Sequence, residues 1–176
     1  MGHEEHRQKA PRSVRVFVIT ASDTRGEAED ESGSYLRRAA SGAGHDVVGY
    51  RIVKDEPSLI RAALAEASAA NAEAILVNGG TGVSTRDRTY EAVAGLLDKR
   101  LDGFGELFRS LSFQEIGSAA MLSRAVAGVW QGRALFSVPG SRAAVRLAWE
   151  KLIGPELGHL AYELAKHAGG GHRQGA

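Results

Sequence analysis

The sequence contains no cysteine among its 176 residues, and this absence excludes disulfides, thiolate metal sites and a thiol nucleophile. Neither sign of charge predominates, because 22 Lys and Arg stand against 21 Asp and Glu, and this balance argues against electrostatic nucleic-acid binding. With 43% apolar and 24% charged residues, the composition excludes disorder or membrane spans as descriptions of the whole chain. The first residues are polar and do not resemble a secretory signal, so we expect a cytoplasmic protein without nucleic-acid or membrane partners.

The length predicts one domain, which we place at residues 14–168 between flexible tails at 1–13 and 169–176. Outside these tails the only histidines are His45, His159 and His167, and none has an evident partner in the sequence. Histidine-based acid–base catalysis is therefore not expected.

Short apolar, β-branched runs alternate with segments of helical periodicity. Strands are predicted at 14–20, 46–53, 74–77, 126–130 and 134–138. Helices are predicted around Leu36 to Ala43 and at about 57–70, 88–97, 103–110, 141–152 and 155–168, with Asp30 or Ser32 capping the first and Gly44 ending it. This alternation predicts an α/β fold, a three-layer α/β/α sandwich with a mostly parallel, Rossmann-like central sheet.

Small polar, glycine and aspartate residues follow the predicted strands. They are Ser22 and Asp23, then Asp55, then Gly79, Gly80, Thr81, Gly82 and Asp87, and finally Pro139, Gly140 and Ser141. Because ligands of open parallel sheets bind beyond the carboxyl ends of the strands, we expect these groups to share one edge of the sheet.

The run Gly79-Gly80-Thr81-Gly82 places three glycines in four residues at a strand exit. Such a loop allows positive φ angles and a close approach of phosphate to backbone N–H groups. It is neither a Walker loop nor a complete dinucleotide fingerprint. Phosphate binding and a merely tight strand exit both remain open from the pattern alone.

Asp55 and Asp87 each precede a predicted helix, where an N-cap is the simplest role. Beside a phosphate loop they would repel the ligand unless a divalent cation lay between, and Mg²⁺ takes one or two carboxylates together with phosphate oxygens. Asp23 is either a third ligand or a turn residue. Arg86, Arg88 and Arg124 are candidates for neutralising phosphate, with solvated surface charge as the alternative, and Ser141 is a candidate helix cap facing an anion.

An apolar stripe runs along the predicted helix at 103–110 and beyond it. It consists of Phe104, Leu107, Phe108, Leu111 and Phe113. Core packing and a subunit interface are both compatible with this stripe.

Several runs of the chain, in the same order, resemble the MoaB/MogA family of molybdenum cofactor biosynthesis proteins. They are residues 78–92, 103–106, 122–125 and 138–141, together with Asp55-Glu56 after an apolar strand. Two further runs, 24–33 and 108–117, are more similar to the B branch of that family than to its MogA-like and gephyrin-like members.

The resemblance implies a molybdopterin-binding fold and adenylylation of molybdopterin, in which ATP and the terminal phosphate of the pterin give adenylated molybdopterin and pyrophosphate with Mg²⁺. It implies that Asp55 and Asp87 are the essential, metal-associated aspartates and that Gly79 to Gly82 hold phosphate. Ser22, Asp23, Ser123 and Ser141 would line the pterin or nucleotide site. It also implies a trimer or hexamer, with other cofactor-biosynthesis proteins as candidate partners.

Two alternatives to the adenylyltransferase are a non-catalytic molybdopterin carrier or scaffold of the same family and, with less support, an unrelated nucleotide-binding module. The sequence does not separate the molybdenum from the tungsten pathway.

Overall fold

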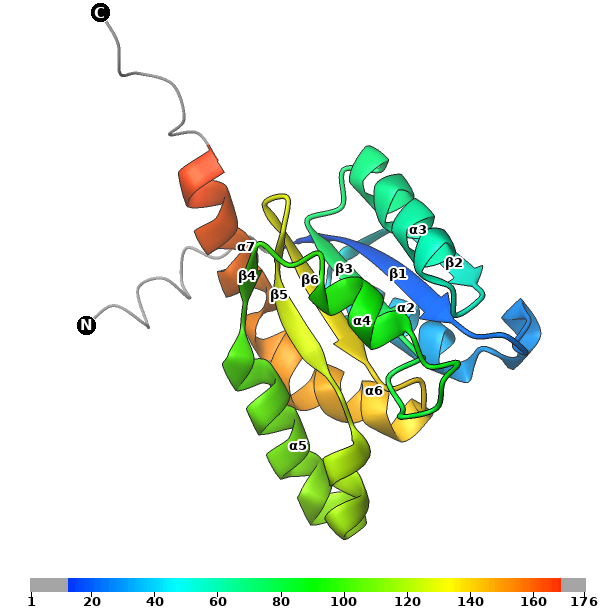
Figure 1. Ribbon diagram of the computed structural model, residues 1–176. Helices are drawn as coiled ribbons and strands as arrows, with labels where there is room; N and C mark the ends of the chain where they lie inside the picture. Colours follow the sequence, from blue (N-terminus) through cyan, green and yellow to red (C-terminus); the bar gives the residue numbers. More distant parts are fainter. Residues whose placement is uncertain (1–12, 169–176) are drawn as a thin grey trace, which may run out of the picture.

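The computed structural model describes residues 13–168, so the predicted tails lie outside the described residues except for Ser13. Six strands form one sheet in the order β2-β1-β3-β6-β5-β4 (Figure 1). Their bounds are β1 Arg15–Ala21, β2 Asp46–Val53, β3 Ala74–Asn78, β4 Lys99–Arg100, β5 Val126–Trp130 and β6 Arg133–Val138. The predicted α/β fold with a mostly parallel sheet is confirmed, and β4 is a short strand that no sequence pattern indicated.

Neighbouring strands β2, β1, β3 and β6 are parallel, whereas β5 runs antiparallel to β6 and to β4. The antiparallel pair follows from the tight turn at Gln131 and Gly132, both of which have positive φ angles. The four parallel strands therefore end at the same edge of the sheet, and the loops that leave them meet there.

Helices cover both faces of the sheet and complete the three layers (Figure 1). Their bounds are α2 Glu31–Gly42, α3 Pro57–Ala69, α4 Thr89–Ala94, α5 Asp102–Ile116, α6 Arg142–Ala148 and α7 Gly154–Ala168, with short 3-10 turns at Glu27–Glu29 and Gly117–Leu122. One apolar cluster joins α2, α5, α6 and α7 to one face, and a second joins α3 and α4 to the other.

Strand β1 shows why the sheet is held between two cores. Its side chains alternate, so Val16 and Val18 enter one cluster while Phe17 and Ile19 enter the other. All four are buried, as expected for a central parallel strand with helices on both faces.

The helix ends differ from the sequence expectations in places. The predicted helix at 88–97 is only Thr89–Ala94, and the one at 141–152 ends at Ala148 and continues as a π-helical turn, Trp149–Ile153. Both ends of α2 agree with the sequence expectation. Asp30, one of the two expected caps, accepts a hydrogen bond from the Gly33 N–H at the start of the helix, and Gly44 lies just beyond its end with a φ angle of 87°.

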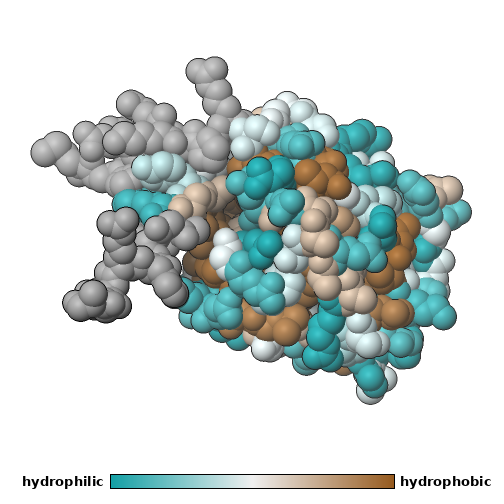
Figure 2. All heavy atoms as spheres, turned by 90° about the horizontal axis from the view of Figure 1, so that it is seen from above, coloured by the Kyte–Doolittle hydropathy of each residue, from teal (hydrophilic) through white to brown (hydrophobic). Residues whose placement is uncertain are grey.

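The apolar stripe of α5 divides between core and surface. Phe104 and Phe108 are buried against the sheet, so core packing is confirmed for them. Phe113 is 62% exposed and Leu107 also faces outward. The face seen in Figure 2 likewise carries apolar patches between hydrophilic side chains, which is ordinary for a folded domain.

His45 has a structural partner that the sequence did not reveal. Its Nδ1 accepts a hydrogen bond of 3.2 Å from the Val14 N–H, and its ring lies edge-on to Trp149. Burial lowers the pKa of this imidazole. Within residues 13–168, no helix is both long and apolar enough to span a membrane.

Candidate active site at the ends of the parallel strands

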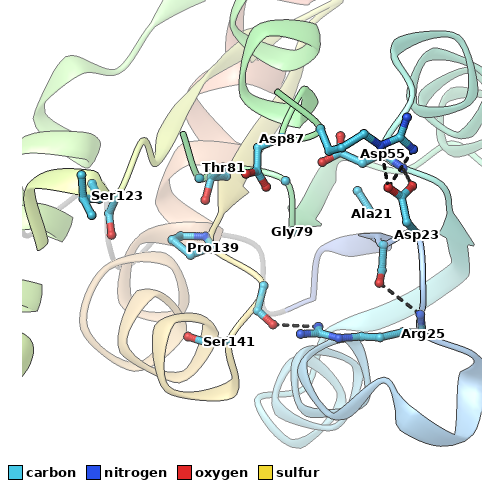
Figure 3. Close-up of a pocket in the computed structure, with 16 residues that line it drawn as sticks. Ala21, Asp23, Arg25, Asp55, Gly79, Thr81, Asp87, Ser123, Pro139 and Ser141 are labelled. Atoms are coloured by element: carbon cyan, nitrogen blue, oxygen red, sulfur yellow. Dashed lines mark hydrogen bonds and ion pairs between the residues drawn. The ribbon is translucent and has the colours of Figure 1, made fainter. Parts of the chain in front are cut away.

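A cavity of about 470 Å³ opens where the four parallel strands end (Figure 3). Its lining includes every strand-exit residue that the sequence predicted for this edge, together with Arg86 and Ser123. The full lining is Ala21, Ser22, Asp23, Arg25, Asp55, Gly79, Gly80, Thr81, Gly82, Arg86, Asp87, Leu122, Ser123, Pro139, Gly140 and Ser141. Segments far apart in the chain thus meet at one edge of the sheet, as the parallel arrangement requires.

The glycine loop leaves β3 in a conformation that side chains would block. Gly79 and Gly80 have φ angles of 109° and 53°, in the region that favours glycine. A Cβ on Gly79 would lie 2.0 Å from the Ala21 carbonyl oxygen, and one on Gly80 would lie 1.9 Å from Asp55 Oδ2. The backbone of Gly79 and Gly80 therefore packs directly against the end of β1 at Ala21 and against Asp55, which follows β2.

Asp55 is the buried carboxylate of the cavity, with 6% of its surface exposed. Its Oδ1 accepts from Thr89 Oγ1 at 2.8 Å and from the Arg88 N–H at 3.2 Å, which ties the end of β2 to the start of α4. Burial raises the pKa of the Asp55 carboxyl, the Thr89 and Arg88 donors oppose this, and the negative charges of Asp87 and Asp23 add to the rise.

Asp87 lies on the loop between Gly82 and α4. Its Oδ2 accepts from the Ser84 N–H at 3.0 Å, so the side chain closes its own loop. A Cβ on Gly82 would lie 2.8 Å from the same oxygen. The alternative that each aspartate caps the helix directly after it is wrong, because the N-caps of α3 and α4 are Glu56 and Arg88.

Asp23 pairs with Arg86 across the cavity mouth. Arg86 Nη2 and Nε lie 2.7 Å and 3.0 Å from Asp23 Oδ2, and these hydrogen bonds hold the pKa of the Asp23 carboxyl below its usual range. The other oxygen of Asp23 accepts from the Asp55 N–H at 3.2 Å. Asp23 thereby links the exit of β1 to the loop after β3 through Arg86, and to the exit of β2 through Asp55.

Arg124 supports the glycine loop and does not line the cavity described by residues 13–168. Its Nε donates to the Thr81 carbonyl at 3.1 Å, and its Nη2 donates to the carbonyls of Gly82 and Asp87. It also pairs with Glu91. Its positive charge is thus neutralised within the protein, and its contacts are those of a residue that positions the loop.

A buried polar network lies beneath the cavity. Asp30 is 1% exposed, and its carboxylate accepts from Thr20 Oγ1 at 2.6 Å, Tyr50 Oη at 2.5 Å and the Gly33 N–H at 2.9 Å. Burial acts to raise the pKa of Asp30, but the donors outweigh it and the pKa is lowered. Burial and the adjacent Asp30 charge raise the pKa of the Tyr50 phenol.

The network continues to the strand end that carries the glycine loop. Ser32 Oγ lies 2.8 Å from Asn78 Oδ1, and Asn78 Nδ2 donates to Thr20 Oγ1 at 2.9 Å. Asn78 is the last residue of β3, directly before Gly79. The start of the loop is therefore anchored by side chains that sequence reasoning did not connect to the site.

Three lining residues were missed by the sequence analysis: Ala21, Arg25 and Leu122. Arg25 is the informative one, because its Nη1 donates to the Gly140 carbonyl at 2.8 Å and so joins the loop after β1 to the loop after β6 (Figure 3). The available signal was its place three residues after Ser22 in a strand-exit loop.

The described residues contain no group of three or more His, Cys, Asp or Glu side chains arranged to hold a metal ion. Mg²⁺ does not demand such a cage, because it commonly uses one or two carboxylates with phosphate oxygens and water completing its shell. Asp55 and Asp87 both line the cavity and match that donor chemistry, and the negative charge of Asp87 adds to the rise in the pKa of Asp55.

The chain matches the family model described as a probable molybdopterin binding domain over residues 16–159. It is 54% identical over 168 residues to molybdenum cofactor biosynthesis protein B of Halalkalibacterium halodurans, covering 94% of this chain and 99% of the relative. The protein of the same name from Escherichia coli K12 is 46% identical over 145 residues, covering 82% and 85%.

Solved structures show the same likeness. A crystal structure of molybdenum cofactor biosynthesis protein B matches with a TM-score of 0.85 at 50% identity, covering 89% of this chain and 99% of that one. The tungsten cofactor synthesizing protein MoaB from Pyrococcus furiosus matches with a TM-score of 0.79 at 39% identity, covering 90% and 99%. The chain therefore belongs to the MoaB/MogA family of molybdenum cofactor biosynthesis proteins.

Proposed function

We propose that this chain acts in molybdenum cofactor biosynthesis as a Mg-ATP-dependent molybdopterin adenylyltransferase. An oxygen of the terminal phosphate of molybdopterin forms a bond to the α-phosphorus of ATP. The bond between the α-phosphorus and the bridging oxygen to the β-phosphate breaks, and pyrophosphate leaves. The product is adenylated molybdopterin.

One observation carries the proposal: the buried carboxylate of Asp55 lies directly against Gly80, inside the glycine loop. A Cβ on Gly80 would clash with Asp55 Oδ2, so the loop backbone and the carboxylate share one wall of the cavity. An isolated carboxylate there would repel a phosphate held by the loop. The arrangement becomes favourable when a cation accompanies the phosphate, as it does in Mg-ATP.

Asp55 and Asp87 are the residues that would hold Mg²⁺. When bound, the ion supplies charge neutralisation at the phosphate oxygens and at the departing pyrophosphate. The chain itself supplies a fixed glycine loop, anchored by Asn78 and by Arg124, along which phosphates are oriented. Positioning and electrostatic stabilisation are the main demands of such a transfer.

The nucleophile needs little help from a base. A phosphate monoester is already ionised at neutral pH, since its second pKa is about 6. No histidine of residues 13–168 lines the cavity, and the proposed reaction requires none. We therefore assign Asp55 and Asp87 to metal and triphosphate placement and not to proton transfer.

The test is release of pyrophosphate from ATP by the purified full chain, measured with and without molybdopterin and with and without Mg²⁺. We expect release only when all three components are present. Tight pterin binding without any turnover would replace the enzyme with a non-catalytic carrier or scaffold. Absence of pterin binding would remove both.

We also propose that the chain self-associates through the exposed apolar side chains around the end of α5. Phe113 is 62% and Met121 is 77% exposed, and Leu107, Ile116 and Leu122 are exposed as well. Sedimentation at micromolar concentration should give a mass of three or six 18.7 kDa chains. A mass of one chain would contradict the proposal, and Phe113→Glu should shift the mass toward that value.

A further inference from the structure

Arg25 differs from the other arginines around the cavity in its charge balance. Arg86 donates from both Nε and Nη2 to the carboxylate of Asp23, and Arg124 forms a salt bridge with Glu91. Arg25 lines the cavity, yet within residues 13–168 it has no carboxylate partner. Of the two arginines that line the cavity, Arg25 is therefore the one whose guanidinium makes no direct pair with a carboxylate within residues 13–168.

The Arg25 side chain is nevertheless held in place. Its Nη1 donates to the Gly140 carbonyl at 2.8 Å and lies 3.2 Å from Ser32 Oγ, while its backbone N–H donates to Ser22 Oγ at 3.2 Å. Ser32 belongs in turn to the buried network of Asp30 and Asn78. The guanidinium is thus held through Nη1, and among residues 13–168 no group accepts a hydrogen bond from its Nε or Nη2.

The carboxylates of Asp55 and Asp87 lie apart from the Arg25 guanidinium, and the Asp23–Arg86 pair completes the charges that line the cavity. Figure 3 shows Asp55 and Asp87 on one side of Gly79, and Arg25 on the other side beside Ser141. The carboxylate side fits a phosphate that brings its own cation. The Arg25 side fits a phosphate that is not metal-bound, because a fixed guanidinium offers two adjacent N–H donors to such an oxyanion.

We propose that Arg25 binds the terminal phosphate monoester of the pterin substrate and orients it as the nucleophile. This inference rests on the proposed function, which requires two phosphate-bearing substrates in one cavity. It divides the cavity between them, with the metal-bound triphosphate at Asp55 and Asp87 and the metal-free monoester at Arg25. Ser32 is then a positioning residue, because it holds the guanidinium without reaching the substrate.

The experiment is a thermodynamic cycle that combines one change in the protein with one change in the ligand. Affinity is measured for wild type and Arg25→Gln, each with molybdopterin and with its dephosphorylated form. Wild type should bind the dephosphorylated pterin about 10- to 100-fold more weakly than molybdopterin, as expected for lost charge-assisted hydrogen bonds. Arg25→Gln should bind the two ligands with nearly the same affinity. Equal losses in the two proteins would overturn the proposal.

Arg142→Gln is the matched control, since Arg142 is a nearby exposed arginine that does not line the cavity. It removes the same charge and should keep the full dependence on the ligand phosphate. Arg25→Lys, which keeps the charge but cannot reproduce the fork, should fall between wild type and Arg25→Gln. If Arg142→Gln lost as much of this dependence on the ligand phosphate as Arg25→Gln, the overall positive charge of the region and not a direct contact would be responsible. The proposal would then fail.

Inorganic phosphate separates this proposal from the proposed function. Wild type should bind phosphate at every pH at which the Arg25 guanidinium is charged. Arg25→Gln, which lacks that group, should not bind phosphate under the same conditions. If phosphate binding depends on Arg25 but no pterin binds, the anion site stands and the pterin assignment falls with the proposed function. If phosphate binding is absent from wild type or unaffected by Arg25→Gln, the Arg25 proposal falls even where turnover is observed.

Discussion

Asp30 and Asp55 are both buried carboxylates near the same edge of the sheet, yet their surroundings are opposite. Asp30 receives hydrogen bonds from Thr20, Tyr50 and Gly33, and its pKa is lowered. Asp55 receives two donors, has like charges nearby, and its pKa is raised.

The difference distinguishes a carboxylate that stabilises the fold from one that is unfavourable for the fold. A carboxylate whose lone pairs are filled by the protein stabilises its ionised form and holds the fold together. One that is desolvated and lies near other negative charges is costly for the fold, and under the proposed function it is the group that a cation would stabilise. Asp30 belongs to the first kind and Asp55 to the second.

The largest expected effect on activity comes from removing the negative charge of Asp55 or of Asp87. Asp55→Asn and Asp87→Asn should each lower pyrophosphate release by about 100-fold or more, because electrostatic placement of the phosphates is lost. The melting temperature should stay within a few degrees of wild type, since burial and repulsion already oppose the Asp55 charge. Calorimetry and the turnover assay on the same samples measure both quantities.

Asp46→Asn is the control for these variants, because Asp46 is exposed at the far end of β2, the strand that Asp55 follows. It should leave turnover and stability unchanged. A large loss of stability in Asp55→Asn with kinetics otherwise intact would make Asp55 a structural residue like Asp30 and erase the distinction.

Asp30→Asn should give the reverse result. Losing the ionised acceptor of Thr20, Tyr50 and Gly33 should lower the free energy of unfolding by about 2 kcal/mol. Turnover per folded molecule should change less than about tenfold, because Asp30 acts through Ser32 and Asn78 and does not line the cavity. Urea unfolding gives the first number. A variant that is fully stable but inactive would refute the assignment.

The stabilisation by Asp30 should also depend on pH. Its folded-state pKa is lowered, so its contribution is complete above the unfolded pKa of about 4 and is lost as the pH falls through the folded value. The difference in unfolding free energy between wild type and Asp30→Asn should therefore be constant above about pH 5 and shrink below about pH 4. A difference that grew on acidification would contradict the lowered pKa.

The smallest effect is expected from Tyr50→Phe, which removes one donor and leaves the others on Asp30. It should cost about 1 kcal/mol of unfolding free energy. Tyr35→Phe is the matched control, because Tyr35 donates to Glu150 at the surface and should cost less than about 0.5 kcal/mol. Equal costs for both phenols would mean that the buried network adds nothing over a surface contact.

Much of this site could be predicted from residue types and strand ends. The glycine loop, the aspartates and Pro139 to Ser141 all follow apolar runs, and parallel strands bring such exits together. A cap at Asp30 or Ser32 was also expected, because a short polar side chain before a helical pattern is a local signal, and the structure has Asp30 in that place. Local pattern did not reveal Thr20 and Tyr50 as further partners of Asp30, since they lie on separate strands.

The sequence alone determined the order of the helices and of every described strand except β4, the glycines that permit the loop conformation, and the resemblance to the family, because these depend on periodicity, glycine and short motifs. Only the tertiary structure decided which charges are neutralised: Arg86 by Asp23, Arg124 by Glu91, and Arg25 by no carboxylate among the described residues. The physical reason is that pairing depends on distances between residues as far as 63 positions apart, which the folded sheet sets and no local pattern records.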